Sequence, residues 1–406
     1  MEPDRRCGKC GQAIPWGEPE CPLCSQRPGY FWLQRRDTFL ILVFVFIVLQ
    51  FVITGYAVRR YHGVERGLAQ GWYSRGEQAL KSNHAEAALA DFRNALAYSR
   101  DVPLYQLRLA QALVATGRVQ EGRTYLLSLR ERQLGNGPVN LELARLAVRE
   151  HDSPEAVQYF HDAVYSDWDG IPAVQRRAVR LELVDFLLHS DQEAAARAEL
   201  IAVASNLPPD AKLQTQVGAL LMKAGGYDDA LRLFRQALAA EPRSASALAG
   251  AGECYFQTGQ YGQAKRYLDR ALQLDPNLTP AAAMRDTARA VLDLDPFIPR
   301  LGEQERAQRA REAFDQAMTR LEACAAQRGI DLQAARGDLL QTLYAQATTL
   351  QPSMRQRSLS RDSELLSNTM DLVFEIEKAT SQTCGEPKGL DLVLVLIARQ
   401  QEGARP

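Results

Sequence analysis

A pattern of small and large apolar residues returns every 34 residues through the middle of the chain, and it constrains the fold more than any single motif. Each copy begins with a small residue, replaced by Val184 in the fourth copy, and has Ala or Gly twelve positions later and two more apolar residues after that. The copies are Gly76/Ala88/Phe92/Ala95, Ala110/Gly122/Leu126/Leu129, Ala144/Ala156/Phe160/Ala163, Val184/Ala196/Leu200/Val203, Gly218/Ala230/Phe234/Ala237 and Gly252/Ala264/Leu268/Ala271. An insertion, "DWDGIP" at 167–172, shifts the fourth copy. Small residues let two helices approach closely, and large ones fill the space between units, so the pattern predicts an all-α solenoid.

The two clearest copies, residues 217–242 and 250–276, resemble the tetratricopeptide repeat (TPR) family. They share Gly225/Gly259 and Tyr227/Tyr261, and each closes on a proline, Pro242 or Pro276. The resemblance extends over about residues 69–276 and implies about six repeats forming a superhelical solenoid. It also implies a groove that binds a peptide or helix of another protein.

In the TPR family, the side chains that line the groove come mainly from the first helix of each repeat. Carried over position by position, the resemblance implies that the groove residues here are Tyr73, Glu77, Gln111, Arg145, Asp185, Glu253 and Phe256. A solvated helix face is the alternative role for each. The Lys/Asn/Arg clamp that one TPR subclass uses for terminal carboxylates is absent, because its places hold Tyr73, Glu77, Leu107, Arg108 and Glu142.

Residues 39–58, "FLILVFVFIVLQFVITGYAV", contain no charge. As a helix, these twenty residues span roughly 30 Å, the hydrocarbon thickness of a bilayer. Arginines and interfacial aromatics flank the run on both sides. The segment begins too late and is too long for a cleaved signal peptide. We therefore expect one transmembrane helix.

Two C-x2-C pairs, Cys7/Cys10 and Cys21/Cys24, lie ten residues apart in "CGKCGQAIPWGEPECPLC". Four thiolates at this spacing suit tetrahedral zinc, and the knuckles resemble those of zinc ribbons and rubredoxins. We expect a small zinc ribbon over residues 1–30, in which the metal is structural because four protein ligands leave no open position. Two disulfides, or iron in place of zinc, are the alternatives. Through Lys9, Gln12, Trp16 or its arginine-rich flank, the ribbon would contact a protein or nucleic acid, and a folded cap on the cytosolic tail is the alternative.

The arginines near the span do not decide its orientation in the membrane, because both sides carry them: Arg27, Arg35 and Arg36 on one side, and Arg59, Arg60, Arg66 and Arg75 on the other. The orientation is therefore predicted from the cysteine cluster. Thiolate metal sites persist where thiols stay reduced, which places the N-terminus in the cytosol. The repeats would then be extracytosolic, in the periplasm of a Gram-negative cell.

The period is lost after the repeats. Residues 277–299 are expected to form a capping helix and linker, and residues 300–406 a helical domain with stretches at 303–329, 331–351, 361–382 and 389–400. Cys324 and Cys384 would form a disulfide if this part is extracytosolic, and two buried thiols are the alternative.

No catalytic motif stands out, and the five histidines form no ligand pair. A net charge of −1 argues against a dedicated nucleic-acid-binding protein. We therefore expect a non-enzymatic, membrane-anchored TPR adaptor at the inner membrane, which binds partner proteins through its groove and belongs to a larger membrane complex. The alternative is a transmembrane regulator or sensor whose ribbon contacts a cytosolic partner while the repeats read an envelope partner.

Overall fold

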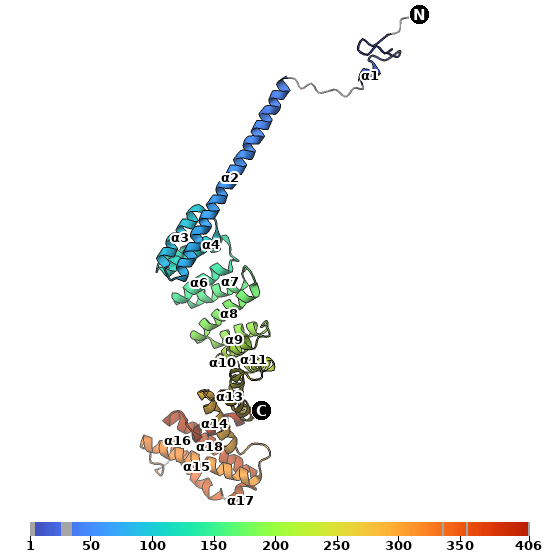
Figure 1. Cartoon of the computed structure of the whole chain (residues 1–406). Helices are drawn as coiled ribbons and strands as arrows, with labels where there is room; N and C mark the ends of the chain where they lie inside the picture. The colour runs from blue at the N-terminus through green and yellow to red at the C-terminus, as the bar shows by residue number, and fades with distance from the viewer. Residues whose placement is uncertain (1–4, 26–34, 335–336, 355, 405–406) are drawn as a thin grey trace. The chain divides into compact units, whose positions relative to one another are not determined.

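The structure is a computed structural model that describes residues 5–25, 35–334, 337–354 and 356–404 (Figure 1). The chain divides into two compact units, residues 1–129 and 130–406, and each unit is described by itself. The helices are α1 (Pro22–Ser25), α2 (Arg35–Lys81), α3 (Ala85–Tyr98), α4 (Pro103–Ala115), α5 (Val119–Arg132), α6 (Gly137–Arg149), α7 (Ser153–Tyr165), α8 (Pro172–His189), α9 (Glu193–Ala204), α10 (Ala211–Lys223), α11 (Tyr227–Ala240), α12 (Ala245–Gln257), α13 (Tyr261–Leu274), α14 (Thr279–Leu294), α15 (Glu303–Arg328), α16 (Leu339–Leu350), the 3-10 turn η1 (Gln351–Ser353), α17 (Gln356–Leu359), α18 (Ser363–Cys384) and α19 (Leu390–Ala404).

The most unusual element of the first unit is α2, an uninterrupted helix of 47 residues (Figure 1). Its part from residue 39 to residue 58 is exposed along its whole length, and the helix from Phe39 onward is long and apolar enough to span a membrane. The same helix then becomes the first helix of the first repeat, beginning with the fully buried Ala69. The side chains predicted to flank the apolar run on its N-terminal side are not among those that the structure describes.

Helices α2 and α3 pack closely because a glycine faces a phenylalanine. A Cβ on Gly76 would lie 2.6 Å from a ring carbon of Phe92, so only glycine admits the ring at this position. Phe92 is fully buried and joins Leu89 and Leu113 in the core of the first unit. The small residue of the repeat, Gly76, thus leaves the space between the two helices that the large residue, Phe92, fills.

The same packing recurs in the second unit, where helix pairs α6/α7, α8/α9, α10/α11 and α12/α13 follow one another and α14 packs against α13. Phe234 of α11 is 1% exposed and lies against Gly218 of α10 and Gly250 of α12. A Cβ on Gly250 would come within 2.4 Å of its ring. One aromatic side chain therefore fixes the spacing both within one repeat and between two repeats.

The turn between the two helices of each repeat has a constant conformation. The second residue after the end of each first helix has a positive φ, and these residues are Asn83, Gly117, His151, Asp191, Gly225 and Gly259. Glycine adopts this left-handed conformation without strain, and asparagine and aspartate tolerate it better than other residues. Their spacing is that of the sequence repeat, with the insertion at 167–172 lengthening the interval between His151 and Asp191.

Helices α15 to α19 continue the core of the second unit. One cluster of buried residues runs without a break from Tyr255 in α12 to Ile397 in α19. A disulfide joins Cys324 of α15 to Cys384 of α18, sixty residues apart. The helix expected over 331–351 begins only at Leu339, because the side chain of Asp338 caps it by accepting from the backbone of Leu340 at 2.8 Å.

Candidate functional site

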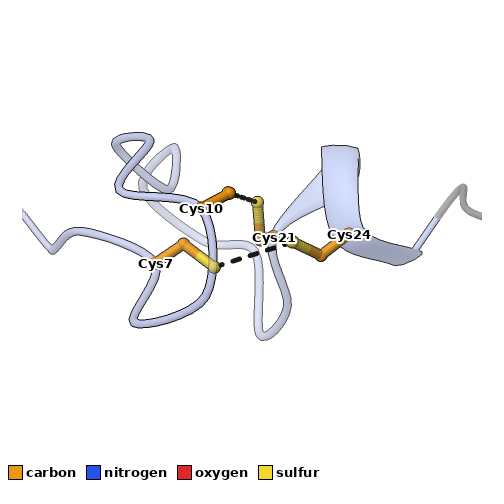
Figure 2. A group of neighbouring side chains, drawn as sticks. All are labelled: Cys7, Cys10, Cys21 and Cys24. Carbon is orange, nitrogen blue, oxygen red and sulfur yellow. Dashed lines mark hydrogen bonds between the residues drawn. The ribbon is translucent and has the colours of Figure 1, made fainter.

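The four N-terminal cysteines converge on one point (Figure 2). Their sulfur atoms all lie within 4.8 Å of one another. The Sγ atoms of Cys7 and Cys24 are 3.9 Å apart, and those of Cys10 and Cys21 are 3.5 Å apart. Four sulfurs bound tetrahedrally to zinc at about 2.3 Å would lie about 3.8 Å from one another. The cluster therefore fits a single metal ion of that size, and all four thiols are free of disulfides.

Backbone hydrogen bonds hold the two cysteine pairs. After the first pair, the N–H of Gly11 donates to the carbonyl of Cys7 at 2.9 Å, and Gly11 has φ +72°. The second pair lies at the start of α1, where the N–H of Cys24 donates to the carbonyl of Cys21 at 3.0 Å. Both turns are local, which explains how so short a segment can bring the four sulfurs together.

The electrostatics of the cluster favour a bound cation. The backbone N–H groups of Lys9 and Cys10 lower the pKa of the Cys7 thiol to about 6. The neighbouring Cys10 thiol raises the pKa of Cys24 to about 12, because crowded sulfurs resist further loss of protons. A divalent ion at the centre would offset the charge of four thiolates, so the donor set suits a structural zinc.

The three predicted groove residues of the first unit, Tyr73, Glu77 and Gln111, lie on the first helices, and each contacts another residue of this unit. Arg108 of α4 places its Nε 2.7 Å from Oε1 of Glu77, and its Nη1 donates to Oε1 of Gln111 at 2.7 Å. The Tyr73 ring stacks on Tyr105, with 5.0 Å between the ring centroids. Tyr73, Glu77, Arg108 and Gln111 are half-buried and Tyr105 is buried. The Arg108–Glu77 and Tyr73–Tyr105 contacts join α2 to α4.

In the second unit, Arg145 of α6 binds two carboxylates. Its Nε and Nη2 lie 2.7 Å and 2.9 Å from the two carboxylate oxygens of Glu182 in α8, and Nη1 donates to Glu142 at 2.7 Å. The Glu182 carboxylate, as the largest cause, raises the pKa of Arg145. Arg145 thus links consecutive first helices, as Arg108 does in the first unit.

The remaining groove predictions fall on residues with different surroundings. Asp185 is 70% exposed, with His189 Nδ1 at 3.5 Å. Glu253 is half-buried, and burial raises its pKa. Phe256 packs edge-on against the ring of Tyr261, 5.4 Å between centroids, and therefore contributes to the core of the second unit. Of these three, Asp185 is the one that a partner would reach most easily.

The ion pairs between repeats were not predicted from the sequence, although their positions follow the repeat. Glu77 and Arg145 each follow the small residue of their own repeat by one position. Their partners Arg108 and Glu182 lie two positions before Ala110 and Val184, which begin the pattern in the next repeat. Opposite charges at these two positions predict an ion pair between consecutive repeats. The acidic residue comes first in Glu77–Arg108, and the basic residue comes first in Arg145–Glu182.

Comparison with known families finds tetratricopeptide repeats in two segments of the chain. Two family models described as tetratricopeptide repeat match residues 73–137 and 221–287. The prediction of TPRs is therefore confirmed. No curated protein matches the chain.

Three solved structures illustrate the similarity of this chain to other proteins. The TPR protein YrrB, described as having an unusual peptide-binding site, is 18% identical, with a TM-score of 0.38 and coverage of 48% of this chain and 97% of its own. Pseudomonas aeruginosa PilF is 15% identical, with a TM-score of 0.38 and coverage of 55% and 98%. PilW, described as a type IV pilus biogenesis factor, is 17% identical, with a TM-score of 0.36 and coverage of 54% and 98%.

Proposed function

We propose that this protein is a single-pass membrane adaptor, which acts by binding other proteins along its repeats and holding them at the cell envelope. One observation carries the proposal: α2 contains both the exposed apolar segment and the first helix of the first repeat. A chain built this way fixes a protein-binding solenoid directly to a membrane helix.

The length of α2 sets the distance between the membrane and the first repeat in the proposed arrangement. Residues 39–58 would cross roughly 30 Å of hydrocarbon, and residues 59–68 would add about 15 Å of exposed helix before Ala69 enters the repeat core. Because this connection is helical, the first repeat would follow the orientation of the span. Partners would accordingly be presented at a defined height above the membrane.

The cysteines support opposite compartments for the two ends. The N-terminal four are free thiols grouped as for a metal, which requires a reducing compartment. Cys324 and Cys384 are paired, which requires an oxidising one. The proposed transmembrane segment, residues 39–58, lies between these two groups of cysteines in the sequence. We therefore infer a cytosolic N-terminus, repeats on the extracytosolic side of the inner membrane, and structural zinc bound by Cys7, Cys10, Cys21 and Cys24.

A second function is favoured by the surface of the cysteine cluster. Trp16 is 94% exposed and Leu23 is 58% exposed, although the described segment around them has only 21 residues. Large apolar side chains exposed on so small a unit suit a contact with another protein. The corresponding function is a regulator, in which the zinc ribbon binds a cytosolic partner while the repeats bind an envelope partner.

Two experiments test these proposals. Alkaline phosphatase fused after residue 65 or residue 400 should be active, and a fluorescent protein at the N-terminus should remain fluorescent; the reverse pattern would overturn the topology. Photo-crosslinking from Asp185, followed by purification of the full chain from membranes, should recover partner proteins. Failure to recover any protein from this position and from the neighbouring first-helix positions would overturn the adaptor function.

The same purification separates the adaptor from the regulator. The variant W16S/L23S leaves the four cysteines in place and removes both exposed apolar side chains. Loss of one crosslinked partner in this variant, with the repeat-bound partners retained, would support the regulator. An unchanged partner set would exclude it.

A further inference from the structure

The insertion at 167–172, which breaks the repeat period, also lengthens one helix. The first helices α4, α6, α10 and α12 each have 13 residues, whereas α8 has 18. The added residues are at its N-terminus, because α8 begins twelve positions before the small-residue position of its repeat instead of seven. Ala173 and Arg176 belong to this added segment.

The insertion is held in place by specific contacts. Trp168 Nε1 donates to the carbonyl of Ala163 at 2.8 Å, and the indole lies against Gly137, where a Cβ would come within 2.4 Å of the ring. Backbone hydrogen bonds join Gly137 to Asp167 at 3.2 Å and Asp167 to Gly135 at 2.8 Å. The start of α8 is therefore positioned by packing on α6 and α7.

A cavity of about 410 Å³ lies where this extended start of α8 meets the C-terminal ends of α7 and α9. Val164 and Val203 contribute apolar surface, while Arg176, Arg177 and Arg180 contribute three guanidinium groups along one side of α8. Tyr165, at the end of α7, is 74% exposed beside them. The cavity thus combines an apolar floor with a cationic wall.

The positive charge of this wall is largely uncompensated. Arg180 Nε lies 3.6 Å from Oε2 of Glu199, which also faces His161 at 3.8 Å. Arg176 donates weakly to the carbonyl of Ser166 at 3.4 Å. Arg177 makes no ion pair or hydrogen bond with any residue in the described part of the chain. Of the three guanidinium groups, only that of Arg180 therefore lies near a carboxylate in the described part of the chain.

We infer that this cavity binds an acidic segment of a partner protein, with carboxylates on Arg176 and Arg177 and an apolar side chain on the floor formed by Val164 and Val203. The inference rests on the proposed function as a protein adaptor. Guanidinium groups bind carboxylates through two parallel hydrogen bonds, and the exposed Tyr165 ring adds apolar contact. The apolar floor distinguishes a peptide from a free anion such as phosphate. The site lies at the helix ends, apart from the first-helix residues assigned to the groove.

The test measures fluorescence anisotropy of a labelled peptide with the full chain in lipid nanodiscs. The probe is a ten-residue peptide of Leu, Glu and Asp, compared with the same peptide carrying Lys at every acidic position. The acidic peptide should bind and the basic one should not. R176E/R177E should weaken binding about tenfold or more, since two charge-assisted hydrogen-bonded contacts become repulsive.

Two matched variants control for net charge and for guanidinium geometry. R232E/R289E makes the same change of charge at exposed arginines of α11 and α14 and should leave binding unchanged. R176K/R177K keeps the charge without the planar fork and should retain the preference for the acidic peptide at reduced affinity. Circular dichroism should give the same helix content for all variants.

The inference is overturned if wild type and R176E/R177E bind the acidic peptide equally, or if R232E/R289E weakens binding as much as R176E/R177E. If inorganic phosphate displaces the labelled peptide as effectively as unlabelled peptide does, the cavity binds a small anion and the inference of a peptide ligand is overturned. If membrane purification recovers partners but the acidic peptide does not bind, this inference fails and the adaptor function stands. If no partner is recovered in any experiment, the adaptor function itself fails.

Discussion

Arg145 and Glu182 form a two-pronged ion pair between the first helices of consecutive repeats, with nitrogen–oxygen distances of 2.7 Å and 2.9 Å. Arg108 and Glu77 occupy the equivalent positions in the first unit with the charges exchanged, 2.7 Å apart. These pairs lie among the first-helix residues that the resemblance to TPRs predicts to line a groove. A ligand of this face would therefore have to compete with contacts that already join the repeats.

Breaking this pair should cost little stability. Both side chains are more than a third exposed, so R145A is expected to lower the free energy of unfolding by about 1 kcal/mol or less. A double-mutant cycle with E182A should give a positive coupling energy. R149A removes an exposed arginine from the same helix and serves as the control. Equal effects of R145A and R149A, with no coupling, would show that the pair contributes nothing.

Adding one methyl group at Gly250 should disrupt the packing of two repeats. Its Cβ would lie 2.4 Å from the ring of Phe234, which is fully buried and cannot move aside. G250A is expected to destabilise the second unit by about 1–3 kcal/mol in urea unfolding. G262A, on α13 with no atom within 4 Å of the new methyl group, should cause no loss. If both variants unfold at the same urea concentration, the close contact does not exist.

The stability of the second unit should fall as pH rises from about 4.5 to about 8. Burial raises the pKa of Glu377 to about 8, and Asp391 adds to this, while Arg320 at 3.1 Å opposes it. In this window the unfolded chain releases a proton that the folded chain keeps, so unfolding becomes easier as pH rises. The slope from this group cannot exceed about 1.4 kcal/mol per pH unit.

The variant E377Q isolates this effect. It removes the titrating group at nearly constant volume, so thermal midpoints between pH 5 and pH 8 should vary less than in the wild type. E375Q, at an exposed position of the same helix, is the control and should follow the wild type. A pH dependence that survives in E377Q would assign it to other groups.

One zinc ion per chain should be bound by the N-terminal cysteines. Elemental analysis of the purified protein is expected to give one zinc equivalent, which C7S/C10S should abolish because two ligands remain. C324S/C384S removes the same number of cysteines elsewhere and should keep the metal. Iron in place of zinc, or zinc retained in C7S/C10S, would contradict this assignment.

Reduction should weaken the C-terminal helices. The bond between Cys324 and Cys384 closes a segment of sixty residues, for which chain entropy gives a stabilisation of about 4 kcal/mol. Dithiothreitol should therefore lower the urea midpoint of the wild type and leave that of C324S/C384S unchanged. A midpoint in the wild type that does not respond to dithiothreitol would show that the two thiols are unpaired.

The repeat register followed from the sequence because helix packing depends on residue size at fixed positions. Gly76, Phe92 and Phe234 could be assigned to helix contacts from spacing alone, and the family models matched the segments that contain them. The four cysteines could also be grouped, because both pairs are local and their turns need few residues. The C-terminal domain was visible only as helical stretches, since its packing joins residues such as Arg320 and Glu377 that are far apart in the chain.

The sequence by itself determined the periodic helix pairs, the apolar segment at 39–58 and the pairing of the cysteine motifs, because each depends on residue type at short range. Only the tertiary structure decided that the apolar segment and the first repeat share one helix, that Arg145 is occupied by Glu182, and that three arginines border a cavity beside Tyr165. These features depend on side-chain direction between neighbouring repeats, and the sequence spacing carries no record of that direction.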